Sequence, residues 1–363
     1  MYQLAPSPRS HPTSSLGMAP GSKAGRVKPS EVAADTKRNF IPMVNASYAK
    51  VFPPFSVLYR HPTTQLEIPR RTLSTRPPAF HFVAEDPVMM AISYGVADSQ
   101  ASEAAGTGRV RIPVICAANE RRPGGDWETG SSGYEEKLCR RSNLSATLSA
   151  PWPGSGEPSN YPIPSTGGIL SDSVVVYRGP HDRYEKLDRW YDLPVVSVPP
   201  TRWPKLKDNG SRYSFAEERG MMRDKMRGAL RICLYNNYDR VVIGDFGLGN
   251  SCRNPPQEVA EIWRDVFLFD PDLRGQFAYV IFAFEDPAQS TTQLILDEIA
   301  KRDKKGCSKG RSRGESSGSN SSTSSRGRAP TDLGIFQRVF DPAEIQRVLS
   351  APDPRYGLDM ITC

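Results

Sequence analysis

Apolar runs of strand length alternate with longer amphipathic patterns through the middle of the chain. Most of the runs are apolar at successive positions rather than at every second one, which is typical of strands buried on both faces of a sheet. The segments predicted as strands are 80–87, 109–119, 172–179, 194–200, 239–247 and 277–286.

Helical patterns fill much of the chain between these strands. The predicted helices are 88–95, ending at Gly95, followed by 134–142, 215–237, 255–267 and 341–350. The longest of them carries apolar residues at helical spacing, which indicates a core face rather than a ligand site; these residues are Met222, Met226, Leu230 and Cys233. Strands that alternate with helices predict an α/β fold whose sheet is covered on both faces.

Composition divides the chain into four parts. Residues 1–45 are predicted to be a disordered N-terminal tail, and 46–302 to form the folded domain. Residues 303–331 are a basic, serine-rich segment of low complexity that cannot form a core. Residues 332–363 are expected to be an extension that packs on the domain through its helix.

The net charge of +7 is concentrated in one place. Residues 301–328 contain nine basic and two acidic residues, which account for the whole excess. The rest of the chain is therefore neutral overall, and composition does not support a basic nucleic-acid surface on the folded domain. Any nucleic-acid association is expected only through 301–328, and a serine-rich basic segment is more often a solvated spacer.

Cysteine and histidine spacing provides no metal or disulfide signature. The six cysteines are scattered without a CxxC pair and there are only four histidines, so no metal or cofactor is expected. No apolar run approaches the ~20 residues that span a bilayer, and no signal-peptide core follows Met1. These features predict an intracellular protein, cytoplasmic or nuclear. Four prolines among the first twenty residues disfavour an amphipathic import helix there.

Candidate chemistry is concentrated in PGGDWETGSSGYEEKLCRRSNL, residues 123–144. Gly124 and Gly125 permit backbone angles that let amides approach an anion closely. Glu135 and Glu136 follow at the start of a predicted helix. Two interpretations stay open, because the segment from Ser132 to Glu135 also fits an S-x-x-E capping box that needs no catalysis.

A second glycine-rich turn, GDFGLGNSCRNPP at 244–256, lies between a predicted strand and a predicted helix. Such a turn directs amides and the helix dipole toward a phosphate, although an ordinary glycine turn is an equally good interpretation. Both turns follow the carboxyl ends of strands, so they are expected to converge on one edge of the sheet. That convergence favours a ligand that contains phosphate.

The run from Cys116 to Leu144 resembles the signature of the microbial-type poly(ADP-ribose) glycohydrolases, a macrodomain family. The spacing from Pro123 to Glu136 matches without a gap, and LCRRS at 138–142 matches residue for residue. GDFGLGNSCRNPP is similar to the later phosphate loop of the family, with one extra residue, and FHFVAEDPVMMA to its early strand and helix. The resemblance covers about 80–286 and implies a macrodomain-like three-layer α/β/α fold with a mixed central sheet.

The resemblance also implies roles for individual residues. Glu136 corresponds to the general acid that protonates the leaving ribose oxygen and then activates water, and Glu135 to the carboxylate that holds ribose hydroxyls. Asn119 corresponds to the contact with the distal ribose, and Asp86 to the acid that meets the adenine amino group. The loops against the diphosphate would be formed by Gly124 and Gly125 on one side and by Gly247, Gly249 and Asn250 on the other.

Several positions depart from the family pattern. Asp126 replaces its third glycine and Tyr134 its glutamine, while Leu248 and Cys116 replace a cysteine and an asparagine. A carboxylate at 126 would repel a diphosphate by roughly 1 kcal/mol at ~4 Å unless it is paired or points away. No aromatic residue of the second loop corresponds to the one that stacks on the ligand in the family.

The resemblance implies a hydrolase that cleaves ribose–ribose bonds of poly(ADP-ribose) and releases ADP-ribose. Glu136 would act first as acid and then as base; burial, Glu135 and Asp126 would favour its protonated form, whereas the helix dipole would oppose it. The alternatives are an inactive ADP-ribose reader with the same pocket, favoured by Asp126 and Tyr134, and a nucleic-acid-associated protein acting through 301–328. The expected partners are ADP-ribose or its polymeric conjugates, with no membrane.

Overall fold

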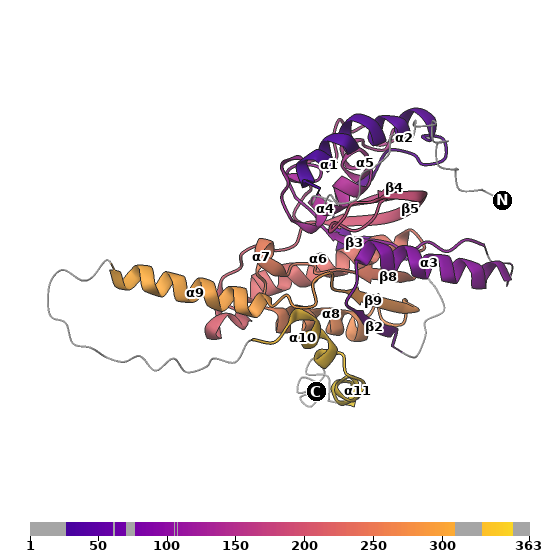
Figure 1. The fold of residues 1–363 in the computed structure, drawn as a ribbon. Coiled ribbons are helices and arrows are strands. Elements are labelled where there is room, and N and C mark those ends of the chain that lie inside the picture. Colours follow the sequence, from indigo (N-terminus) through magenta and orange to yellow (C-terminus); the bar gives the residue numbers. More distant parts are fainter. Residues whose placement is uncertain are drawn as a thin grey trace, which may run out of the picture.

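The computed structural model describes residues 27–60, 62–69, 77–104, 106, 108–308 and 329–350, without the side chains of 303–308. A seven-stranded sheet in the order β1-β4-β5-β3-β8-β9-β2 runs through the domain (Figure 1). Its strands are β1 Val57–Tyr59, β2 Ala79–Val83, β3 Val114–Ala117, β4 Gly168–Arg178, β5 Lys186–Val198, β8 Arg240–Ile243 and β9 Tyr279–Ala283. All the predicted strands are present, and β1 was not predicted.

The sheet is mixed, as predicted. Strands β5, β3, β8, β9 and β2 run parallel to one another, whereas β4 is antiparallel to both β1 and β5. A separate hairpin is formed by β6 Leu206–Lys207 and β7 Arg212–Tyr213. The parallel strands explain the continuous apolar runs, because both of their faces are covered.

Helices cover the two faces of the sheet (Figure 1). Their bounds are α1 Pro29–Asp35, α2 Ile41–Ser47, α3 Pro87–Ala104, α4 Tyr134–Arg141, α5 Leu144–Ser149, α6 Ala216–Tyr235, α7 Gly249–Cys252, α8 Pro256–Phe269, α9 Thr291–Ser308, α10 Asp332–Val339 and α11 Pro342–Ser350. Successive residues of β8 enter different cores: Val241 and Ile243 pack with α6 and α8, and Val242 packs with α3 and α4. This alternation is what a sheet between two helical layers requires.

The N-terminal segment corrects one prediction. Residues 29–47 form α1, a π-helical turn over Thr36–Phe40 and α2, instead of the disordered tail expected up to residue 45. Phe40 is buried and stacks on Tyr177 of β4 with ring centroids 4.4 Å apart. The apolar face of this segment therefore covers the sheet, and its burial is the reason that the segment is ordered. Residues 1–26 lie outside the described residues.

Helix α3 also differs from its prediction. It continues to Ala104 and does not end at Gly95. A methyl group at position 95 would lie 3.4 Å from the carbonyl oxygen of Val110. Glycine there permits close approach of α3 to the chain before β3, and it does not cap the helix.

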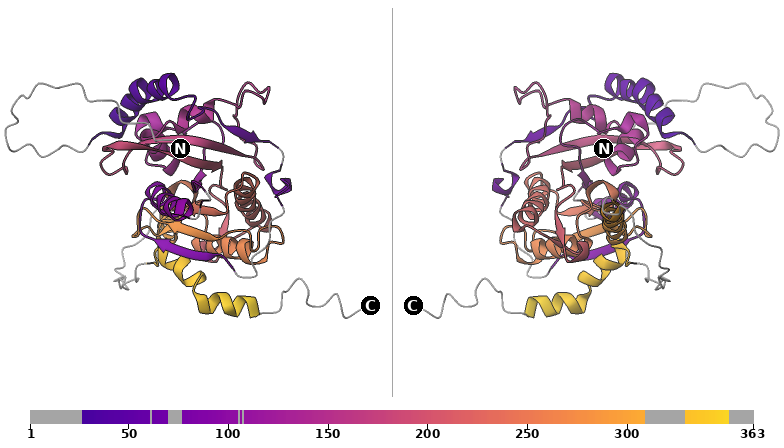
Figure 2. Two further views of the ribbon diagram at one scale, coloured as in Figure 1. Left: turned by 90° about the vertical axis from the view of Figure 1, so that its right-hand side faces the viewer. Right: turned by 90° about the vertical axis from the view of Figure 1, so that its left-hand side faces the viewer.

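The C-terminal segments pack on the α8 side. Phe336 of α10 is buried between Phe282 and Phe284, and Ile345 of α11 reaches the same core. Figure 2 shows α11 at the margin of the domain. Residues 309–328 of the low-complexity segment lie outside the described residues. No helix in the described ranges is long and apolar enough to cross a membrane.

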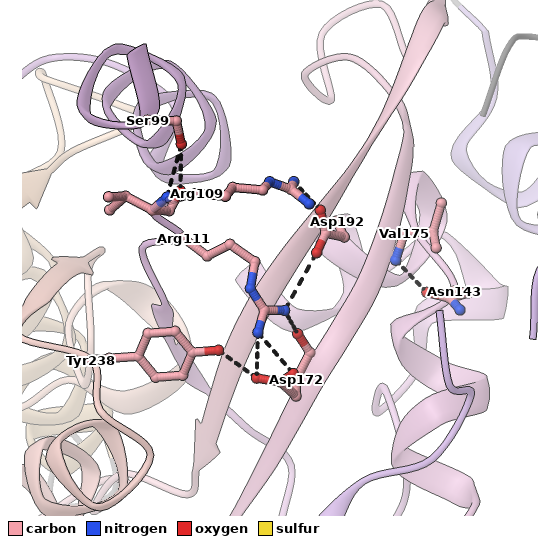
Figure 3. Close-up of polar contacts among 9 residues, drawn as sticks. Ser99, Arg109, Arg111, Asn143, Asp172, Val175, Asp192 and Tyr238 are labelled. Carbon is pink, nitrogen blue, oxygen red and sulfur yellow. Dashed lines mark hydrogen bonds and ion pairs between the residues drawn. The ribbon is translucent and has the colours of Figure 1, made fainter. Parts of the chain in front are cut away.

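An ion-pair network fastens the sheet at the amino ends of β3 and β8 (Figure 3). Arg111 donates to Asp172 of β4 at 3.0 Å and to Asp192 of β5 at 3.3 Å, and Arg109 pairs with the same Asp192. Tyr238, before β8, donates its hydroxyl to Asp172. These contacts join the antiparallel and parallel halves of the sheet, at the edge opposite to the predicted site.

Candidate active site

The two glycine-rich loops begin side by side. Strands β3 and β8 are parallel neighbours, with Val114 opposite Val242 and Ile115 opposite Ile243. The chain that follows their carboxyl ends, 118–133 and 244–249, therefore starts at the same edge of the sheet, as predicted. Helix α4, which carries both glutamates, follows the first of these loops.

Glu135 is buried and holds the first loop in place. Its Oε2 accepts a hydrogen bond from the amide of Asn119 at 2.6 Å, and its Oε1 accepts one from the amide of Gly124 at 3.2 Å. Burial raises the pKa of Glu135 to about 8, and the charge of Glu136 adds to this rise, although the two amide hydrogen bonds oppose it. Glu135 thus connects the end of β3, the loop and α4.

Glu136 is half-buried and its carboxylate lies within the glycines of the first loop. A methyl group at position 125 would lie 2.6 Å from its Oε1, and one at position 133 would lie 2.0 Å from its Oε2. The amide of Asp126 donates to Oε1 at 3.4 Å. Burial raises the pKa of the Cys252 thiol in α7 to about 12, and the charge of Glu136 adds to this rise. The glycines at 125 and 133 therefore leave the space that this carboxylate occupies.

Left-handed backbone makes glycine necessary at the centre of the first loop. Gly124 has φ +73° and Gly125 has φ +56°. A methyl group at position 124 would lie 2.8 Å from Sγ of Cys139 and 2.8 Å from the ring of Trp127. Both the backbone angle and the space thus exclude a side chain.

Asn119 is half-buried at the end of β3 and turns its side chain into the first loop. Its Oδ1 accepts hydrogen bonds from the amides of Arg121 at 2.8 Å and Arg122 at 3.2 Å. Its Nδ2 would lie 3.4 Å from a methyl group at position 125. The structure therefore brings Asn119 beside the same glycine as Glu136.

Hydrogen bonds to side chains of neighbouring segments hold the second loop in place. Gly247 has φ +79° and accepts a hydrogen bond from Nδ2 of Asn254 at 2.7 Å. The amide of Gly249 donates to Oγ1 of Thr291 at 2.7 Å, so this donor is already used within the protein. Asn250 is exposed, and its side-chain oxygen accepts a hydrogen bond from Arg253 at 3.2 Å.

Asp86 is engaged by other parts of the protein. Its Oδ1 accepts a hydrogen bond from the amide of Met89 at 2.8 Å, and its Oδ2 pairs with buried Arg141 at 2.7 Å. The first contact caps the start of α3, and the second ties it to α4. The predicted contact between Asp86 and adenine would have to use the carboxylate lone pairs that the bonds to Met89 and Arg141 leave free.

The two main departures from the family pattern have different environments. The side chain of Asp126 is 51% exposed and pairs with Arg122, so its charge is balanced. Tyr134 packs its ring 3.8 Å from the position of a methyl group on Gly244, at the end of β8. Its buried hydroxyl has no hydrogen-bond partner among the described residues, and burial raises its pKa.

Further charged residues at this edge were not predicted. Lys137 contacts Glu285 at 2.6 Å and His181 contacts the other oxygen of Glu285 at 2.5 Å. Although burial alone would raise it, these two partners lower the pKa of Glu285 to about 2. Asp245, after β8, has its pKa raised to about 6 by burial, with the charge of Glu285 adding to the rise.

Arg202 also contacts the first loop and was missed. It follows the carboxyl end of β5 and donates to the carbonyl oxygen of Ala118 at 3.2 Å. Its charge opposes the rise in the pKa of Glu135. Strand β5 is parallel to β3, so the rule that brought the two glycine loops together would also have placed Arg202 here.

Comparisons with known proteins found one sequence family and several solved structures that are similar to this chain. Residues 59–179 match the sequence model of a family described as "Microbial-type PARG, catalytic domain". A poly(ADP-ribose) glycohydrolase (PARG) structure from Thermomonospora curvata is 20% identical, covers 74% of this chain and 98% of its own, and has a TM-score of 0.52. A mutant of the Deinococcus radiodurans enzyme in complex with ADP-ribose is 18% identical, with coverage of 70% and 98% and a TM-score of 0.50.

These structural matches show a shared fold, and no curated protein matches the sequence. The family match contains the first loop and both glutamates, whereas the second loop lies outside it. Residues 59–179 are therefore similar to the microbial-type PARG catalytic domains, and the chain shares the fold of the solved bacterial PARGs.

Proposed function

We propose that this protein hydrolyses the ribose–ribose O-glycosidic bonds of poly(ADP-ribose) and releases ADP-ribose. The observation that carries the proposal is the position of Glu136. Its carboxylate projects from α4 between Gly125 and Gly133, next to the buried Glu135, and the first loop starts beside the second. A single carboxylic acid enclosed by main-chain atoms is suited to protonate the glycosidic oxygen between two riboses, next to a diphosphate.

The proposed mechanism uses Glu136 twice. In its protonated form it gives the proton to the leaving ribose oxygen as the bond from that oxygen to the anomeric carbon breaks, which leaves an oxocarbenium-like centre. The resulting carboxylate then takes a proton from water while the water oxygen bonds to the anomeric carbon. Glu135 keeps the loop in register, because it accepts the amides of Asn119 and Gly124.

A second candidate function is a reader that binds ADP-ribose without turnover. Two groups expected to hold ribose are engaged within the protein, which favours this alternative. Both oxygens of Glu135 accept backbone amides, and Oδ1 of Asn119 accepts those of Arg121 and Arg122. A reader would share the pocket and lack the reaction.

The test compares the wild type with Glu136→Gln, which keeps the shape of the side chain and removes the acid. We expect the wild type to release ADP-ribose from the polymer, and Glu136→Gln to lose roughly 10²- to 10⁴-fold in rate. The affinity for free ADP-ribose, measured by titration calorimetry, should change little. Glu128→Gln is the matched control, because Glu128 lies in the same loop but is exposed and paired with Lys37 at 2.8 Å.

The outcomes separate the two functions. Equal ADP-ribose binding with no product from either protein would establish the reader. Equal rates for both proteins would remove Glu136 from the mechanism. A wild type that ignores free ADP-ribose would contradict the hydrolase and the reader together.

A further inference from the structure

The segment 199–215, between β5 and α6, carries exposed aromatic rings beside cations. Trp203 is 51% exposed, and the guanidinium carbon of Arg253 lies 4.4 Å from its ring centroid. Phe215 is 47% exposed, and Nζ of Lys205 lies 5.6 Å from its ring centroid. The segment contains four basic residues and one acidic residue, although the folded domain is neutral overall. Cations interleaved with accessible rings are typical of surfaces that bind single-stranded polyanions with bases.

This segment touches both loops of the candidate active site. Arg202 donates to the carbonyl oxygen of Ala118, the first residue of the first loop, at 3.2 Å. The amide of Trp203 donates to the carbonyl oxygen of Cys252, the last residue of α7, at 2.7 Å. Two successive residues therefore join the chain after β3 to the chain after β8, and the exposed indole belongs to the rim of the site.

The backbone at Trp203 is unusual. Its φ of +52° lies in the left-handed region, which a bulky residue adopts at a cost. Arg253, which covers the ring, has φ +54°. The side chain of Arg253 is only 13% exposed, and its Nη1 lies 3.5 Å from Oε2 of Glu298. The ring is thus held beside a nearly buried cation, at a position that glycine would occupy with less strain.

The order of the strands indicates how a ligand would lie along the site. Asp86, the predicted adenine contact, follows β2, whereas Trp203 follows β5, and β9, β8 and β3 lie between them. With adenine at the β2 end and the diphosphate on the loops after β3 and β8, the ribose that is cleaved lies toward β5. Across the scissile bond, the next unit of the polymer begins with its adenosine ribose. Its adenine is therefore one sugar away from the cleaved bond, on the β5 side.

We infer that Arg202, Trp203 and Arg253 form a subsite for the neighbouring ADP-ribose unit, on the leaving-group side of the cleaved bond. Trp203 stacks on the adenine of that unit, while Arg253 polarises the ring. Arg202, which forms no ion pair with the described carboxylates, binds the phosphates of that unit. This inference rests on the proposed function and adds to it a binding site for the unit next to the cleaved one.

The experiment measures binding without turnover, in the Glu136→Gln background. Titration calorimetry compares free ADP-ribose with a purified two-unit oligomer. We expect the oligomer to bind more tightly than the monomer, and Trp203→Ala to weaken oligomer binding by about 5- to 100-fold, the range for loss of one base–aromatic stack. Monomer affinity should change less than twofold. Trp203→Phe should retain most of the oligomer affinity, whereas Trp203→Leu should not.

Further variants distinguish the loss of a ligand contact from damage to the fold. Trp152→Ala removes a ring of similar exposure, 47%, from the turn after α5, and it should change neither affinity. Arg202→Gln keeps a donor for the carbonyl oxygen of Ala118 and removes the charge. It should lower the slope of log Kd against log salt for the oligomer by about 0.7, the value for one phosphate contact on a single strand.

Three results would overturn the inference. Equal losses for monomer and oligomer in Trp203→Ala would place the ring in the pocket of the cleaved unit. Unchanged binding of both ligands would show that the ring is not a binding surface. Failure of the Glu136→Gln protein to bind even monomeric ADP-ribose would instead contradict the proposed function itself, and the subsite would fall with it.

Discussion

Glu135 makes the stability of this protein depend on pH in a direction opposite to that of most carboxylates. The folded protein holds its pKa at about 8, whereas the ordinary value is 4.5. Between these values the native state keeps a proton that the unfolded state has released. Stability from this group is therefore fully present below pH 4.5, and it is lost as pH rises toward 8. At about 1.4 kcal/mol for each pKa unit, the loss amounts to roughly 5 kcal/mol.

The variant Glu135→Gln tests this reasoning because glutamine remains neutral. Its oxygen can accept the amide of Asn119, but its NH₂ group then faces the amide of Gly124, which is left without an acceptor. We expect the variant to be about 1–3 kcal/mol less stable than the wild type at pH 5. The difference should shrink or change sign by pH 8.5, because only the wild type is then burdened by a buried charge.

The assay is urea unfolding followed by circular dichroism at intervals from pH 5 to pH 9. Asp245, whose pKa is raised to about 6 by burial, contributes a pH dependence of the same sign, but it is present in both proteins and is removed by subtraction. Glu128→Gln, at an exposed position of the same loop, should show no such pH-dependent difference from the wild type. A difference between Glu135→Gln and wild type that stays constant across this range would refute the argument.

Two further predictions concern the first loop and the N-terminal helices. Gly125→Ala should reduce ADP-ribose release at least 10-fold, because its methyl group would lie 2.6 Å from the proposed catalytic carboxylate. Gly130→Ala is the matched control. Gly130 also has a left-handed φ of +92°, but no atom lies closer than 3.8 Å to the added methyl group. This variant should lose only about 1–2 kcal/mol of stability from its backbone angle and keep its activity. Phe40→Ala should destabilise the domain by about 3–5 kcal/mol in urea unfolding, and a loss below 1 kcal/mol would mean that the N-terminal helices are not part of the core.

The arrangement of the sheet was largely accessible from the sequence. Uninterrupted apolar runs identified the parallel strands, and the rule that loops after parallel strands share an edge brought 118–133 and 244–249 together. The N-terminal helices were missed because prolines and polar residues mask them. A signal did exist, since Val32, Thr36, Phe40 and Val44, all buried, recur at intervals of four residues.

The details of the site depended on contacts that only the folded chain creates. The effect of Asp126 could not be judged until its pairing with Arg122 was known. Tyr134 acquires its neighbour from the end of β8, far away in sequence. Arg202 and Trp203 have no motif of their own, and they reach the site because β5 is adjacent to β3. Their proposed role follows from strand order rather than from local pattern.

Glu135 and Glu136 are adjacent on one helix, and helix geometry explains why their side chains have different surroundings. Successive residues of an α-helix point about 100° apart, so when one side chain faces the core its neighbour faces away from it. Glu135 turns inward and is fixed by two main-chain amides. Glu136 consequently points along the loop surface, where glycines at 125 and 133 leave room only for its carboxylate. The buried glutamate therefore fixes the direction of the one proposed to be catalytic, and a change at 135 should act on any turnover through the position of 136.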